Sequence, residues 1–239
     1  MRKLIFMFVF LISSVFTMSM IVPSALAETE GSSNSIEVSP IQGPTVARQL
    51  VGRAKTSWVW YVTRASGLVA AVSLVILILS GIGQITGHTF KFLEPLTAWA
   101  SHRALGIVFS ISLFAHILGV VVDKFVPFSI WQVLVPWLSD YKPVTVFGIH
   151  LGSLYIAFGV LSFYGTVLIM LTSLVWIEKK PYLWKISHLL SYLVMFFVFI
   201  HALYLGTDLV HGVLRWLWIV SGVFIVYASI ARLWRAKTT

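Results

Sequence analysis

The sequence predicts an all-α, polytopic transmembrane helix bundle with five spans and an amino-terminal signal peptide or sixth span. Of the 239 residues, 59% are hydrophobic and 10% are charged, whereas soluble domains average roughly 45–50% apolar residues. The apolar residues gather in runs of the roughly 20 helical residues that cross a hydrocarbon core of about 30 Å. These runs cover about residues 65–86, 102–122, 145–176, 186–206 and 213–234.

The first thirty residues have the order of a secretory signal peptide. Arg2 and Lys3 precede an apolar stretch, and the Ala25-Leu26-Ala27 segment precedes an acidic, serine-rich tract, which predicts cleavage after Ala27. The apolar stretch is long for a signal, so residues 1–27 as an uncleaved first span are the alternative. Both interpretations place residue 28 outside. They predict an exported linker over 28–57, a transmembrane domain over 58–235 and a cytoplasmic tail over 236–239.

The net charge of +9 indicates topology rather than nucleic-acid binding, because the basic residues flank apolar runs. The 177–185 loop and the tail are strongly basic, whereas 207–212 has no Lys or Arg. This predicts a bacterial-type cytoplasmic membrane protein with its carboxyl terminus in the cytoplasm. Basic segments usually stay in the cytoplasm. Arg48, Arg53 and Lys55 of the linker, together with Arg64, lie on the predicted outer side and do not follow this rule.

The chain has no cysteine, which excludes disulfides, iron–sulfur clusters and covalent c-type haem. Histidine is then the obvious nitrogen ligand for a metal.

Two of the apolar runs carry two histidines each. His102 and His116 lie in the second run, and His188 and His201 lie in the fourth. One span separates these runs, so their helices are parallel, and each offers one imidazole near the inner side and one nearer the outer side. At 1.5 Å per residue, the two levels lie roughly 20 Å apart. Haem b suits such levels, because its macrocycle is apolar and its iron accepts two axial imidazoles.

The histidine spacing leaves another explanation open. Fourteen residues return His116 to within roughly 40° of His102, but thirteen residues leave His188 and His201 roughly 140° apart on an ideal helix. Lone membrane histidines are often only hydrogen-bonded, and those near the ends of a run can be interfacial. The alternative is therefore a haem-free polytopic protein, such as a small transporter or assembly partner, whose histidines relay protons or bind a metal ion.

The histidine pattern resembles the ferric reductase-like transmembrane domain family. The resemblance rests on His-x13-His, beginning in "WASHRALG", and on His-x12-His along "WKISHLLSY" and "HALYLGTD". The segment "YVTRASGLVA" is similar to the opening of that domain, and the resemblance covers about residues 58–235. The family includes the membrane domains of NADPH oxidases and ferric reductases, and small bacterial relatives of the haem-binding methionine sulfoxide reductase subunit.

The resemblance implies transmembrane electron transfer through two b haems. It implies that His102 pairs with His188 on the inner haem, and that His116 pairs with His201 on the outer haem. The chain would be the haem-containing membrane component of an oxidoreductase, between a cytoplasmic flavin or quinol donor and an extracytoplasmic acceptor. No G-x-G-x-x-G fingerprint follows a predicted strand, so flavin is expected only on a partner. A quinone is a further candidate cofactor.

Five other polar residues complete the candidates. Arg103 and Arg64 could bind haem propionates through charge-assisted hydrogen bonds, or could be interfacial anchors. His150 is expected one or two turns inside its span, as a contact for a quinone or acceptor or as a structural residue. No role is assigned to His88 or His211.

Overall fold

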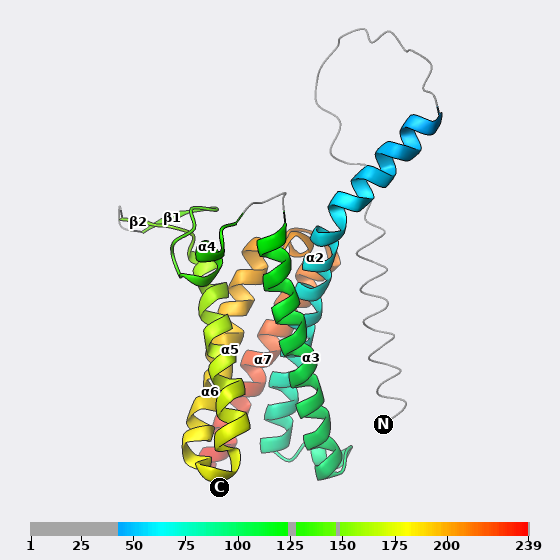
Figure 1. Ribbon diagram of the computed structural model, residues 1–239. Coiled ribbons are helices and arrows are strands. Elements are labelled where there is room, and N and C mark those ends of the chain that lie inside the picture. The colour runs from blue at the N-terminus through cyan, green and yellow to red at the C-terminus, as the bar shows by residue number, and fades with distance from the viewer. Residues whose placement is uncertain (1–42, 124–127, 147–148, 239) are drawn as a thin grey trace.

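The computed structural model describes residues 43–123, 128–146 and 149–238. In these ranges, five helices are long and apolar enough to cross a membrane, and they lie side by side as a bundle (Figure 1). They are α2 (Gly43–Ile85), α3 (Pro95–Val122), α5 (Leu154–Lys179), α6 (Pro181–Leu205) and α7 (Gly212–Thr238). The predicted fold class is confirmed, and the chain is a multi-pass helical membrane protein. The predicted signal peptide or sixth span lies outside the described residues.

Two helices begin earlier than the apolar runs predict. Helix α2 starts at Gly43, inside the expected linker, and its membrane-length part is Ser57–Ile85. The last proline of the linker is Pro44, in the first turn, where proline is tolerated. Helix α3 starts at Pro95 rather than near residue 102, again with proline in its first turn. The first parts of α2 and α3 have low hydropathy. A prediction based on apolar runs therefore started both helices too late.

The third span begins later than predicted, because two paired strands precede α5. Strands β1 (Val144–Val146) and β2 (Ile149–Leu151) pair antiparallel, with Thr145 opposite His150. The hairpin is rich in β-branched residues, which favour extended structure. Ser153 then caps α5 by accepting a hydrogen bond from the Ile156 amide. The prediction that His150 lies inside the helical span is therefore wrong.

Three short elements complete the connections. Helix α4 (Ile130–Leu134) begins with a capping box between Ser129 and Gln132. The 3-10 turns η2 (Thr89–Lys91) and η3 (Thr207–Leu209) follow α2 and α6. The β-hairpin and α4 lie at one end of the bundle, and the carboxyl terminus lies at the other (Figure 1).

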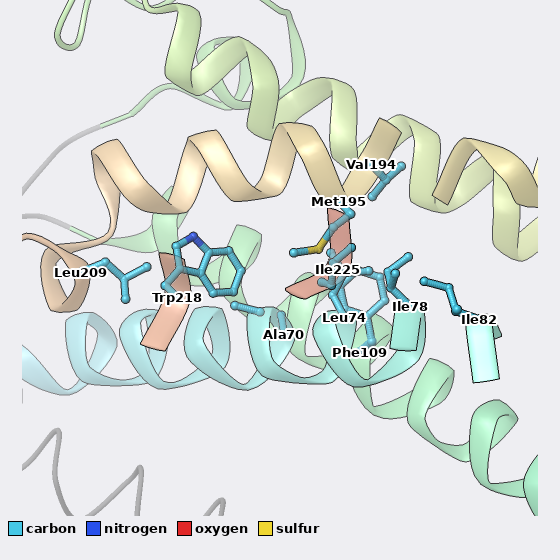
Figure 2. Packing of buried hydrophobic residues seen from close by; sticks show 11 residues of the cluster. Ala70, Leu74, Ile78, Ile82, Phe109, Val194, Met195, Leu209, Trp218 and Ile225 are labelled. Atoms are coloured by element: carbon cyan, nitrogen blue, oxygen red, sulfur yellow. The ribbon is translucent and has the colours of Figure 1, made fainter. Parts of the chain in front are cut away.

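The bundle is built from two antiparallel helix hairpins, α2–α3 and α5–α6, and α2 also packs against α6 and α7. Their shared core contains Ala70, Leu74, Ile78, Ile82, Phe109, Val194, Met195, Leu209, Trp218 and Ile225. Figure 2 shows the α2 members of this cluster facing Met195 of α6 and Trp218 of α7. Helix α2 is therefore the central element that joins the two hairpins.

The outer faces of the bundle are apolar and uncovered. On α3, the exposed side chains Ile107, Ile111, Phe114 and Leu118 follow one another at helical spacing along a single face. A lipid bilayer satisfies such a face, because hydrocarbon chains solvate apolar side chains without cost.

Candidate functional site

Helices α3 and α6 bring His102 and His188 together. Their ring centres are 6.2 Å apart, and the ring planes are inclined at 51°. Each histidine stands seven positions after the proline that opens its helix, Pro95 or Pro181. Both therefore lie about two turns inside their helices, at the same distance from the helix start.

His116 and His201 form the second pair. The Nδ1 atom of His116 is 2.8 Å from the carbonyl oxygen of Thr63 on α2, and that of His201 is 2.8 Å from the carbonyl oxygen of Tyr155 on α5. A carbonyl oxygen only accepts, so each Nδ1 carries the proton and donates. The Nε2 atom of each neutral ring is then free to bind a metal.

His102 bonds to a side-chain hydroxyl of α2 rather than to a carbonyl. Its Nδ1 is 2.7 Å from Ser80 Oγ, and Ser80 Oγ lies 3.0 Å from the Leu77 carbonyl oxygen. A hydroxyl both donates and accepts, so this bond orients the His102 ring in either tautomer.

His188 differs from the other three. Within the described part of the chain, its buried Nδ1 has no hydrogen-bond partner. Its ring lies against Trp184, one turn earlier on α6, with centres 5.3 Å apart, and Trp184 donates through Nε1 to Ser173 Oγ of α5. Trp184 therefore packs on the His188 ring while its own indole nitrogen bonds to α5.

The unequal histidine spacings correspond to different neighbours. Both histidines of α3 lie against α2: His116 bonds to Thr63, and His102 bonds to Ser80. The histidines of α6 diverge, because His201 bonds to α5 whereas His188 lies beside His102 of α3. A spacing of fourteen residues keeps two side chains on one face, and thirteen turns the second towards another helix. The angular difficulty raised by the thirteen-residue spacing is thereby explained.

Glycines make room for two of the four rings. A Cβ atom on Gly67 would lie 2.9 Å from His116 Nδ1, and one on Gly159 would lie 2.6 Å from His201 Nδ1. At Gly81 it would lie 3.6 Å from His102 Cε1, an ordinary contact. The rings of the second pair therefore lie directly on the backbone of the adjacent helix.

In the described residues, no group of three or more histidine or acidic side chains is placed to hold a metal ion. The candidate ligands come in pairs of imidazoles from α3 and α6. Two neutral nitrogens make an incomplete set for a bare ion such as zinc, which takes four ligands in structural sites and three protein ligands in catalytic ones. The two imidazoles of a pair therefore suit a metal that is already bound by another group, because that group supplies the remaining ligands.

The two candidate arginines have different surroundings. Arg64 pairs with Asp208 of η3, with its Nε 3.0 Å from Oδ2 and its terminal nitrogen against Oδ1. Its guanidinium also lies 4.1 Å from the ring centre of Trp60. Arg103 is exposed, and its guanidinium lies 5.6 Å from the ring centre of Trp99. Arg64 thus already has a carboxylate partner within the chain, whereas Arg103 is accessible.

His88 and His211 lie in the connections between helices, outside the two helices that carry the histidine pairs. His88 follows α2 and lies 3.0 Å from Thr86 Oγ1 through Nδ1, and His211 is an exposed residue just before α7. Sequence reasoning missed Ser80. It interpreted Asp208 as a helix cap, and Gly67 and Gly159 as sites of close helix packing, and it assigned none of the three to the histidines or to Arg64. The carbonyl partners of His116 and His201 leave no side-chain signal in the sequence.

The chain matches no protein-family model, no curated protein and no solved structure.

Proposed function

We propose that this chain transfers electrons across a membrane through two b haems held over residues 58–235. His102 and His188 would be the axial ligands of one haem, and His116 and His201 those of the other. The observation that carries the proposal is the 6.2 Å between the ring centres of His102 and His188. Two imidazoles that bind one metal from opposite sides, with bonds of about 2 Å, have ring centres roughly 6 Å apart.

The donor chemistry supports haem over a bare ion. A porphyrin brings four equatorial nitrogens, so two imidazoles complete a six-coordinate iron. His116 and His201 carry the proton on Nδ1 and leave Nε2 unprotonated, which is the form that binds iron through Nε2. The bound iron would supply a one-electron redox couple, and the residues of the chain would hold, orient and shield it.

The surrounding side chains suit a one-electron carrier. Hydrogen bonds to Nδ1 fix ring orientation and raise the basicity of a ligating histidine. The apolar core beside α3 and α6 excludes water, and low polarity around a metal site affects its reduction potential. Arg103 is the arginine that remains available for a haem propionate, because Arg64 is paired with Asp208.

The direction of transfer follows from the proposed topology. With the carboxyl terminus in the cytoplasm of a bacterial-type cell, electrons would enter at His102 and His188 and leave at His116 and His201. The donor would be a membrane quinol or a separate flavoprotein, and the acceptor would lie outside the membrane. The chain would thus serve as the membrane component of a ferric reductase-like oxidoreductase.

Haem quantification tests the proposal directly. The protein is expressed with adequate haem, purified in detergent and assayed by the pyridine haemochrome method and by its Soret band. We expect about two low-spin b haems per chain, since two imidazoles leave no open axial position. Purified, folded protein with no Soret band would overturn the proposal and favour the haem-free alternative, in which the histidines relay protons.

A further inference from the structure

In the α2–α3 hairpin, Gly67 and the carbonyl of Thr63 together support the His116 ring. Thr63 stands four positions before Gly67, and its oxygen accepts the Nδ1 hydrogen bond at 2.8 Å. The ring lies so close to Gly67 that an added Cβ would be 2.9 Å from Nδ1 and 3.0 Å from Cε1. We call Gly67 with the Thr63 carbonyl the first histidine seat.

The α5–α6 hairpin repeats this arrangement with different side chains. Tyr155 stands four positions before Gly159, and its carbonyl oxygen accepts from His201 Nδ1 at 2.8 Å. A Cβ on Gly159 would lie 2.6 Å from Nδ1 and 2.7 Å from Cε1. Gly159 with the Tyr155 carbonyl is the second histidine seat.

Helix geometry explains why a glycine stands at this position in both seats. The carbonyl of each helical residue points towards the residue four positions later and bonds its amide. The oxygen has a second lone pair, but a side chain on that later residue lies close to it. Glycine has no side chain, so a ring from the next helix can reach the oxygen. The carbonyl then accepts two hydrogen bonds.

The other pair of histidines has no such seats. His102 bonds to a side-chain hydroxyl, that of Ser80, and a Cβ on Gly81 would meet its ring only at ordinary contact distance. His188 has a buried Nδ1 that bonds to no group in the described residues. The seats therefore occur only at the level of His116 and His201. At that level, each hairpin supplies one carbonyl and one glycine.

We infer that Gly67 and Gly159 are positioning residues that orient His116 and His201 as metal ligands, and that the two hairpins are two copies of one structural unit. The inference rests on the proposed function for the identity of the metal group. Each seat fixes the proton on Nδ1 and presents Nε2 as the ligand atom. Each glycine acts only through its histidine and has no contact of its own with the metal group.

Substitution of the glycines by alanine tests the seats. Gly67→Ala and Gly159→Ala should each lower the haem content from about two to about one per chain. Gly81→Ala and Gly106→Ala are the matched controls, because an added Cβ makes an ordinary contact at Gly81 and meets nothing within 4 Å at Gly106. Unchanged haem content and spectrum in both seat variants would overturn the inference, as would equal losses in the controls.

Chemical rescue separates positioning from general misfolding. His116→Gly should lose one haem and regain its low-spin spectrum when haem and imidazole are added together, because free imidazole can occupy the first seat. In His116→Gly with Gly67→Ala, the required imidazole concentration should rise at least about tenfold, which corresponds to one lost hydrogen bond of ordinary strength. His116→Gly with Gly106→Ala should be rescued like the single variant. Equal rescue in all three would contradict a seat.

The protein without haem gives a readout that does not depend on the proposed function. Nitrogen NMR of protein labelled with 15N-histidine should show protonated Nδ1 for His116 and His201, assigned by their loss in the histidine variants. Gly67→Ala should change the His116 signals and leave those of His201 in place. Protonated Nε2 on both residues would overturn the inference. If wild-type protein binds no haem even when haem is supplied, and still shows protonated Nδ1 on both residues, the seats are retained and only the electron-transfer proposal is refuted.

Discussion

Arg64 of α2 and Asp208 of η3 form an ion pair that connects α2 to the turn between α6 and α7. Their side chains are only 16% and 10% exposed, so the pair is largely removed from solvent. The Arg64 guanidinium also lies 4.1 Å from the ring centre of Trp60. The turn and α2 are therefore held by a charged contact in addition to core packing.

Breaking this pair should destabilise the bundle. Asp208→Asn leaves the Arg64 charge without its carboxylate, and loss of one partner of a buried ion pair costs about 3 kcal/mol. Arg64→Gln should cost a similar amount, and the double variant should cost less than the sum, because the two residues are coupled. Thermal unfolding in detergent measures all three. Loss of one haem in Arg64→Gln but not in Asp208→Asn would instead identify Arg64 as a propionate ligand.

Each histidine pair should be separable by substitution. His102→Ala and His188→Ala should remove one haem, and His116→Ala and His201→Ala should remove the other, because each haem loses an axial ligand. The remaining haem should keep its low-spin spectrum. Pyridine haemochrome assays and low-temperature EPR report both quantities. His211→Ala is the control, since His211 is exposed outside the long helices, and a loss of haem there would show that the ligands are wrongly assigned.

The absence of cysteine allows the topology to be mapped with single cysteines. Asp140 lies at the β-hairpin end of the bundle, and Phe92 lies between α2 and α3 at the other end. Both positions are exposed, and Phe92 is 86% exposed. A membrane-impermeant maleimide added to intact cells should label the Asp140→Cys variant and leave the Phe92→Cys variant unlabelled until the cells are lysed. The reverse pattern would place the carboxyl terminus outside and invert the direction of electron flow.

Reduction should depend on a partner. NADH or NADPH alone should not reduce the purified protein within the time of a stopped-flow experiment, whereas a quinol or a cytoplasmic flavin reductase should. In sealed vesicles, an impermeant ferric chelate outside should then be reduced, and His116→Ala or His201→Ala should abolish that reduction. Rapid reduction by nicotinamide alone would reveal a cofactor site in this chain. External reduction that persists without both ligands would exclude them from the path.

The sequence predicted the helices well because hydropathy reports which residues tolerate lipid. It predicted their ends less well. The region around His150 is apolar enough to resemble a span, but the β-branched residues of β1 and the cap at Ser153 determine where α5 begins. At Pro95, the first turns of α3 contain polar residues, so the helix extends beyond its apolar run.

The sequence predicted which side chains form the candidate site, but it did not predict which main-chain groups orient them. The matching depths of His102 and His188 followed from counting spans, and the structure places their rings 6.2 Å apart. The orientation of His116 and His201 depends on main-chain oxygens, and every residue has one. Arg64 was considered for a haem propionate, but its partner Asp208 is distant in sequence and comes close only when α2 packs near η3.

The use of main-chain oxygens in the two seats has an evolutionary consequence. A threonine supplies the acceptor in one hairpin and a tyrosine supplies it in the other, so the hydrogen bond itself does not select the accepting residue. Substitutions at those two positions can accumulate without loss of the acceptor, whereas the glycines four positions later cannot be exchanged so freely. Two halves that arose by duplication could thus diverge in nearly every side chain and still hold their histidines in the same orientation.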